Sequence, residues 1–232
     1  MKALRTLTIL FALALMCLPA PSAAAAEKPF KLDICAMPEH ESFIFWYAKE
    51  QGWDKDEGLD FQIHFFQTGM DQLEALPAKQ WVVGGTGTVP ILVGDKAFCD
   101  AHPDIVVKFL RVWLRGVNMI KKEIKNPKLA EQYHRFWTEW AGQDIEPQMA
   151  KMDLEYHPVF DIDQQLAIFD DSKGPSQVEQ WQDKVLDFFA SQGRFSPEEV
   201  KKIRGSGYIN GTFLKMAAES IKEKPLGGYK LD

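Results

Sequence analysis

Cysteine is scarce in this chain, and its few cysteines follow no metal-binding or redox motif. The 232 residues contain only three, Cys17, Cys35 and Cys99. No CxxC spacing is present, although that spacing is typical of structural zinc sites and of thiol redox centres. Cys35 falls in an expected strand and Cys99 just before an expected helix. A disulfide between these two depends on their geometry, which the sequence leaves open.

An apolar run long enough to cross a membrane is missing as well. The apolar stretch from Leu7 to Leu18 is too short for a membrane-spanning helix. It follows Lys2 and Arg5 and precedes a segment rich in proline and alanine, which is the pattern of a secretory signal peptide. We therefore expect residues 1–26 to be a cleaved signal peptide and the mature chain to be periplasmic.

Basic residues are in the minority. The net charge of the whole chain is -6, and loss of Lys2 and Arg5 with the expected signal peptide moves it to -8. An acidic protein without a basic stripe is a poor binder of nucleic acid. We therefore expect no nucleic-acid partner.

Strands and helices alternate in the first part of the mature chain. Alternating or continuous apolar residues predict strands, and an apolar face ending at Gly52 predicts a helix. The expected strands are 32–37, 59–66 and 81–83, with a helix at 41–52 and a helical turn at 73–76. This order favours a parallel sheet. Ligands of such sheets bind beyond the carboxyl ends of the strands, so the loops after Met37, Phe66 and Val83 form one candidate site.

The chain after Gly94 is expected to be helical. Apolar side chains in the segment 105–124 recur at helical spacing, and Pro103 stands at its start, where a missing N–H costs nothing. The expected fold class is therefore α/β, with a short, mostly parallel sheet followed by a helical region. We expect residues 27–97 to form the α/β lobe and residues 98–232 to form helices that pack on it.

Several fragments, in this order, resemble the solute-binding proteins of ABC importers, in particular the nitrate, sulfonate and taurine group. Each fragment alone is a weak signal, and their order carries the resemblance. The fragments are Ser42–Trp53, Glu57–Phe61, Thr86–Leu92, His102–Val106 and Leu186–Phe189 with Gly193. The resemblance implies a periplasmic-binding-protein fold of type II, a small anionic or zwitterionic solute as ligand, and a permease in the inner membrane as partner.

The chain departs from this family in one large respect. Relatives have a second α/β lobe between the two landmarks that are joined here by residues 94–101 alone. Most of that lobe is missing, which places in doubt the closure of two lobes around a ligand. The alternative function is therefore a single-lobe interaction or sensing protein, or a degenerate paralogue without transport activity. The face left by the missing lobe would then favour self-association.

The resemblance also implies the ligand-binding residues. All of them lie in the three loops or in the helix that follows the first loop. They are Glu39, His40, Ser42, Trp46, Thr68, Gly69, Gly85, Thr86, Gly87 and Thr88. Glycine lets a ligand approach the backbone closely, and hydroxyl groups with free N–H groups suit an anion. The segment 84–88 is equally well explained as a turn between a strand and a helix.

Two acidic residues near the first loop and a run of aromatic residues bear on the charge of the ligand and on the lining of the cleft. Glu39 and Glu41 would repel an anion, so they indicate either an amino group on the ligand or ordinary surface side chains at a helix start. Phe45, Trp46 and Tyr47 are consecutive. We expect that they do not all face the core, and Trp46 is the one expected to line the cleft.

Enzyme chemistry is not indicated. No Ser-His-Asp set, glycine-rich phosphate loop or paired-carboxylate motif stands out, so we expect no catalytic residues and no cofactor. His64, His102, His134 and His157 follow no metal-ligand spacing. We therefore expect no metal site.

Overall fold

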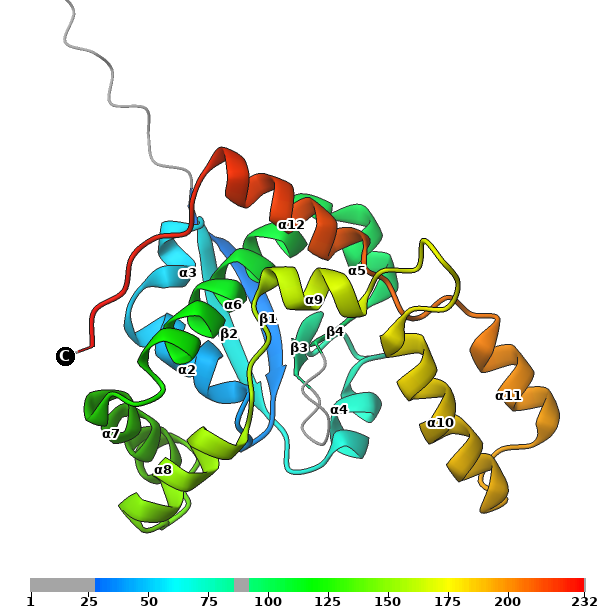
Figure 1. Ribbon diagram of the computed structural model, residues 1–232, viewed down its shortest axis with the longest axis horizontal. Coiled ribbons are helices and arrows are strands. Elements are labelled where there is room, and N and C mark those ends of the chain that lie inside the picture. Colours follow the sequence, from blue (N-terminus) through cyan, green and yellow to red (C-terminus); the bar gives the residue numbers. More distant parts are fainter. Residues whose placement is uncertain (1–27, 86–91, 232) are drawn as a thin grey trace, which may run out of the picture.

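The computed structural model describes residues 28–85 and 92–231, and within them the chain is α/β with a four-stranded mixed sheet. The strands are β1 (Phe30–Ala36), β2 (Leu59–Phe65), β3 (Val83–Gly85) and β4 (Leu92–Gly94). Their order is β2-β1-β3-β4, with β1 parallel to β2 and β3, and β4 antiparallel to β3 (Figure 1). The α/β class and the strands expected at 32–37 and 59–66 are confirmed. The strand expected at 81–83 lies at Val83–Gly85 instead, so only Val83 is shared, and β4 was not expected. The expected signal peptide lies outside the described residues.

Burial explains why β1 is a central strand. Leu32, Ile34 and Cys35 are fully buried, so β1 is covered on both faces, as strands of parallel sheets usually are. In β2 the buried residues Leu59 and Phe61 alternate with more exposed neighbours, which suits the edge of the sheet.

Helices account for most of the remaining chain. Those that follow strands in the lobe are α2 (Ser42–Glu50), α3 (Trp53–Asp56), α4 (Gly69–Ala75) and α5 (Lys96–Ala101). The later elements are α6 (Pro103–Glu123), α7 (Pro127–Arg135), the π-helix η1 (Phe136–Trp140), α8 (Pro147–Tyr156), α9 (Ile162–Ile168), α10 (Gln177–Ser191), α11 (Pro197–Arg204) and α12 (Thr212–Glu223). None of the helices in the described ranges has the length and apolar character needed to cross a membrane.

One core joins the sheet to the first of the later helices. Phe45 of α2 stacks on Phe109 of α6, and Phe109 in turn contacts Phe61 of β2. Gly116 of α6 faces Ile44 of α2 so closely that an added Cβ would lie 3.3 Å from the Cβ of Ile44. The expected boundary between residues 97 and 98 falls within α5. Residues on both sides of it therefore share a single core.

The expectation that three consecutive aromatic residues do not all face the core is wrong. Phe45, Trp46 and Tyr47 have exposed fractions of 1%, 6% and 1%. Helix α2 has the sheet and α6 around part of its circumference, and Phe136 of η1 contacts Trp46 from another direction. A helix covered on several sides has no solvent-facing position left for these rings.

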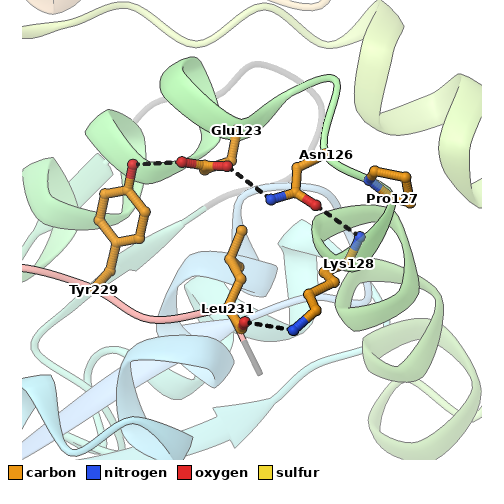
Figure 2. A pocket seen from close by; sticks show the side chains of 6 residues that line it. All are labelled: Glu123, Asn126, Pro127, Lys128, Tyr229 and Leu231. Carbon is orange, nitrogen blue, oxygen red and sulfur yellow. Dashed lines mark hydrogen bonds between the residues drawn. The ribbon is translucent and has the colours of Figure 1, made fainter.

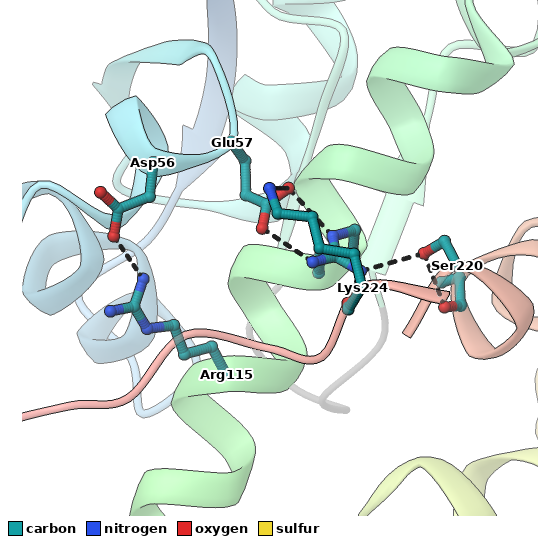
Figure 3. Close-up of polar contacts among 7 residues, drawn as sticks. Asp56, Glu57, Arg115, Ser220 and Lys224 are labelled. Atoms are coloured by element: carbon teal, nitrogen blue, oxygen red, sulfur yellow. Dashed lines mark hydrogen bonds and ion pairs between the residues drawn. The ribbon is translucent and has the colours of Figure 1, made fainter. Parts of the chain in front are cut away.

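A buried ion pair ties the lobe to the C-terminal helix. The guanidinium group of Arg111 in α6 donates to both carboxylate oxygens of Glu57, at 2.9 and 3.0 Å. It also donates to the backbone oxygen of Lys224, just after α12, at 2.9 Å. Figure 3 shows Glu57 and Lys224 close together, with Arg115 bound to Asp56 nearby. Arg111, which is 4% exposed, thus joins the segment before β2 to the end of α12.

The two cysteines are not bridged. Cys35 and Cys99 are both free and buried. Burial raises the pKa of the Cys35 thiol to about 12 and that of Cys99 to about 11. Both thiols are therefore neutral at physiological pH and behave as small apolar core residues.

Helices α10 and α11 project from the rest of the molecule (Figure 1). Arg204 of α11 holds the pair together by binding Asp183 and Asp187 of α10, at 2.8 and 2.6 Å. A row of apolar side chains on α10 remains uncovered, with exposed fractions of 42% for Trp181 and 59% for Phe188.

Candidate functional site

The three expected loops do follow strand ends at one edge of the sheet. Parallel pairing sets Ala36 of β1 opposite Phe65 of β2, and Cys35 of β1 opposite Gly84 of β3. The carboxyl ends of β1, β2 and β3 therefore lie side by side. Figure 1 shows α7 and α8 on one side of this edge and α4 on the other. Thr86, Gly87 and Thr88, expected to bind the ligand, lie outside the described residues.

Side chains from two of the loops meet at the end of the third strand. The side-chain amide of Gln72 in α4, which follows β2, donates to the backbone oxygen of Gly85 at 2.9 Å. The side chain of Glu41, which follows β1, lies against Gly85 from the other direction. A Cβ at position 85 would be 2.7 Å from the Cγ and 3.1 Å from the Oε1 of Glu41. Gly85 is thus the point where the segments after β1 and β2 meet the end of β3, and a Cβ there would require the side chain of Glu41 to shift.

Three polar side chains are buried at this edge, and two of them have an atom without a hydrogen-bond partner among the described residues. Glu41, Ser42 and Gln72 have exposed fractions of 3%, 0% and 1%. The Oγ of Ser42 and the Oε1 of Gln72 have no hydrogen-bond partner among the described residues. An unsatisfied buried acceptor costs about 1–3 kcal/mol. Each buried polar group of this kind calls for an explanation, and a bound ligand is one such explanation.

Four of the expected ligand residues have structural roles in the described chain. Glu39 forms the turn that opens α2, since its backbone oxygen accepts from the backbone N–H of Ser42 at 3.1 Å. Thr68 caps α4 through a reciprocal pair of hydrogen bonds with Asp71, and Gly69 is the first residue of that helix. Trp46 lies in the core, as described above.

His40 belongs to a polar cluster that also includes residues of α7 and α8. Its Nδ1 lies 3.0 Å from the hydroxyl oxygen of Tyr133, and that hydroxyl donates to Oδ2 of Asp153 at 2.5 Å. The ring of His157 stacks on that of His40, with 4.9 Å between the ring centres. The Nδ1 of His157 lies 2.8 Å from the backbone oxygen of Asp153. Helices α7 and α8 are thereby fastened to the loop after β1.

Burial changes the proton affinity of this cluster. Burial, and after it the nearby His157, lower the pKa of His40 to about 4, while Asp153 acts in the opposite direction. Burial, together with Asp153, raises the pKa of the Tyr133 hydroxyl far above its ordinary value. His40 is therefore neutral and Tyr133 protonated at pH 7.

Stability is expected to fall in mild acid because of His40. Its pKa lies at about 4 in the folded chain and at 6.5 ordinarily. Between these values the unfolded chain binds more protons than the folded one, so the free energy of unfolding decreases as the pH falls from 6.5 to 4. The expected loss is roughly 3 kcal/mol at pH 4. Urea unfolding at pH 7 and pH 4.5 measures it, and His40→Gln should flatten the profile. Equal pH profiles for the two proteins would contradict this assignment.

Sequence reasoning missed three residues of this edge. Gln72, Tyr133 and Asp153 carry no motif, and each falls within a helix whose pattern explains its position without any function. Asp153 has a carboxylate oxygen within 4.8 Å of a ring nitrogen of His40, which stands 113 positions earlier in the chain. A local sequence pattern cannot predict an approach between residues so far apart in the chain.

The described cavities lie elsewhere and are lined by groups that already bind one another. One, of about 520 Å³, lies between the start of α7 and the C-terminal segment (Figure 2). There the Tyr229 hydroxyl donates to Glu123 at 3.0 Å, and Asn126 donates to the other carboxylate oxygen of Glu123 at 2.8 Å. None of the ligand residues expected from the sequence lines this cavity.

Comparison with known proteins does not assign this chain to a family. No family model, curated protein or solved structure matches the chain. The resemblance to importer binding proteins therefore rests on the sequence fragments, and the function has to be argued from the edge of the sheet.

Proposed function

We propose that this chain is the substrate-binding component of an ABC-type importer, and that its solute is small and zwitterionic, or anionic, of the nitrate, sulfonate and taurine class. The observation that carries the proposal is the meeting of three strand ends at Gly85, with the buried Oε1 of Gln72 left without a partner among the described residues. An edge of parallel strands with unpaired polar groups is where α/β proteins bind small ligands.

The charges at this edge favour a zwitterion over a simple anion. The carboxyl group of Glu41 and the amide oxygen of Gln72 both flank Gly85, and oxygen atoms of this kind accept hydrogen bonds from an amino group. Thr86, Gly87 and Thr88 directly follow Gly85 in the sequence. In the proposal their hydroxyl and N–H groups bind the acidic end of the same molecule. Taurine has both ends and is the model solute.

A single lobe implies weaker binding than a pair of lobes provides. Two lobes that close on a ligand bury most of its surface, and this chain offers the contacts of one. The proposal therefore places the dissociation constant in the micromolar range or above, about -8 kcal/mol or weaker.

A panel of solutes in a thermal-shift assay tests the proposal. At 100 times its dissociation constant, a bound solute adds about 2.7 kcal/mol to stability, which is a shift of several degrees for a chain of this size. Taurine is expected to raise the melting temperature, and Gln72→Met to abolish that rise. Gln62→Met is the matched control, because Gln62 is a glutamine in the middle of β2. Nitrate, alkane sulfonates, bicarbonate and amino acids complete the panel. The absence of any stabilisation would count against transport.

One observation favours the alternative, a single-lobe interaction protein that associates with itself. The exposed residues Trp181, Val185 and Phe188 recur at helical spacing on α10, and an apolar row of this kind is typical of a contact surface. Sedimentation of the samples used in the solute panel distinguishes the two functions. A dimer that responds to no solute would favour the alternative, and a monomer stabilised by taurine would favour transport.

A further inference from the structure

His40, which comes from the loop after β1, lies beside Asp153 and His157, more than a hundred residues later in the chain. One potential ligand atom from each of the three side chains lies within 4.8 Å of the other two. His40 precedes α2, Asp153 lies in the last turn of α8, and His157 directly follows that helix. Asp153 and His157 are four residues apart, which places them on one face of the helix end.

The hydrogen bonds of His40 determine which ring nitrogen is available. The hydroxyl of Tyr133 has one proton and donates it to Asp153. Its oxygen therefore accepts from His40, so Nδ1 of His40 carries the proton and Nε2 carries a lone pair. That Nε2 is buried and has no hydrogen-bond partner among the described residues. A buried imidazole nitrogen without a partner costs free energy, and coordination of a metal ion would offset that cost.

The contacts of His157 likewise determine which of its ring nitrogens is protonated. Its Nδ1 lies 2.8 Å from the backbone oxygen and 3.1 Å from the Oδ1 of Asp153, and both of these oxygens can only accept. The proton is therefore on Nδ1, and Nε2 carries the lone pair. Histidines that bind metals usually donate their other N–H to an oxygen, which fixes the ring and increases the basicity of the ligating nitrogen. Both histidines here already have this second contact.

We infer that His40, Asp153 and His157 bind a divalent transition-metal ion of the zinc class. Two imidazole nitrogens and one carboxylate oxygen are a ligand set that Zn²⁺ accepts, whereas Mg²⁺ and Ca²⁺ prefer sites made of oxygen alone. Three protein ligands leave the fourth tetrahedral position to water or to a small molecule. This inference does not depend on the proposed transport function.

Binding requires a small contraction of the cluster. Atoms that surround zinc at about 2.0–2.2 Å in a tetrahedron lie about 3.4 Å apart, so ligand atoms spread over 4.8 Å have to approach one another. The end of α8 can supply this movement, since the side chain of His157 is 54% exposed. That exposure also gives the ion a path from solvent.

Titration calorimetry on the full mature chain, after treatment with a chelator, tests the inference. Zn²⁺ is expected to bind with one-to-one stoichiometry and to raise the melting temperature, and Mg²⁺ and Ca²⁺ to do neither. His157→Ala is expected to weaken Zn²⁺ binding at least tenfold. Its exposed side chain makes this variant safe for folding, and circular dichroism confirms that. Asp153→Asn is the second variant and should also weaken binding at least tenfold.

His64→Ala is the matched control. His64 also pairs with an aspartate, Asp33, at 2.7 Å, and it lies in β2, outside the three-residue cluster. This variant is expected to bind Zn²⁺ as tightly as the unmodified chain. The inference fails if Zn²⁺ does not bind one-to-one, if His157→Ala binds it unchanged, or if His64→Ala loses as much affinity as His157→Ala.

Discussion

Replacing Gly84 by alanine is expected to prevent folding, or to lower the free energy of unfolding by more than about 4 kcal/mol. Gly84 lies in β3 directly opposite Cys35 of β1. A Cβ at this position would be 2.8 Å from the backbone nitrogen and 2.6 Å from the sulfur of Cys35, and closer still to its backbone oxygen. Backbone atoms of a central strand cannot move aside as the end of a side chain can. The pairing of β1 with β3 would be lost, and with it the edge at which the loops converge.

Urea unfolding followed by tryptophan fluorescence measures this effect. Gly142→Ala is the matched control, because Gly142 also has a positive φ, +66°, yet nothing lies within 4 Å of the added Cβ. Its cost is confined to backbone strain of about 1–2 kcal/mol. If Gly84→Ala proves no more destabilising than Gly142→Ala, the close approach of β3 to β1 is not as described.

Glu57→Ala is expected to cost about 3–5 kcal/mol, the second largest effect. The guanidinium group of Arg111 is 4% exposed and would lose both carboxylate contacts, leaving a buried charge without its counterion. The attachment of α12 should loosen as well, because the same group binds the backbone at Lys224 (Figure 3). Chemical denaturation gives the free energy, and hydrogen exchange in α12 reports the loosening.

A double variant separates the charge from the packing. Arg111→Met combined with Glu57→Leu removes both charges and keeps apolar volume, so it should be far less destabilising than Glu57→Ala alone. Asp183→Ala, which breaks the exposed pair with Arg204, is the surface control and should cost under about 1 kcal/mol. An equal cost for Asp183→Ala and Glu57→Ala would contradict the importance given to burial here.

The periodic part of the fold could be predicted from the sequence. Apolar spacing and Pro103 placed a helix over residues 105–124, and α6 spans Pro103–Glu123. Long elements of this kind repeat one pattern over several turns, so the pattern outweighs local exceptions. Strand β4 has only the three residues Leu92–Gly94, too few to show any period, and it was missed.

The candidate site could be predicted only where it follows from the order of the strands. Parallel strands place their carboxyl ends together, so the convergence at Gly85 was foreseeable. Which side chains occupy the space was not. Trp46 was expected at a cleft and is buried in the core, because η1 covers a face of α2 that the sequence leaves unassigned. His40 and His157 meet through tertiary packing, and no property of either segment alone indicates it.

The most direct test of the proposed function is a map of backbone amide shifts on addition of taurine. We expect the largest changes at Ser42, Gln72 and Gly85, one from each of the three converging segments. Changes gathered instead around Asn126 and Tyr229, at the cavity of Figure 2, or no changes at saturating taurine, would contradict the claim that these strand ends form one solute site.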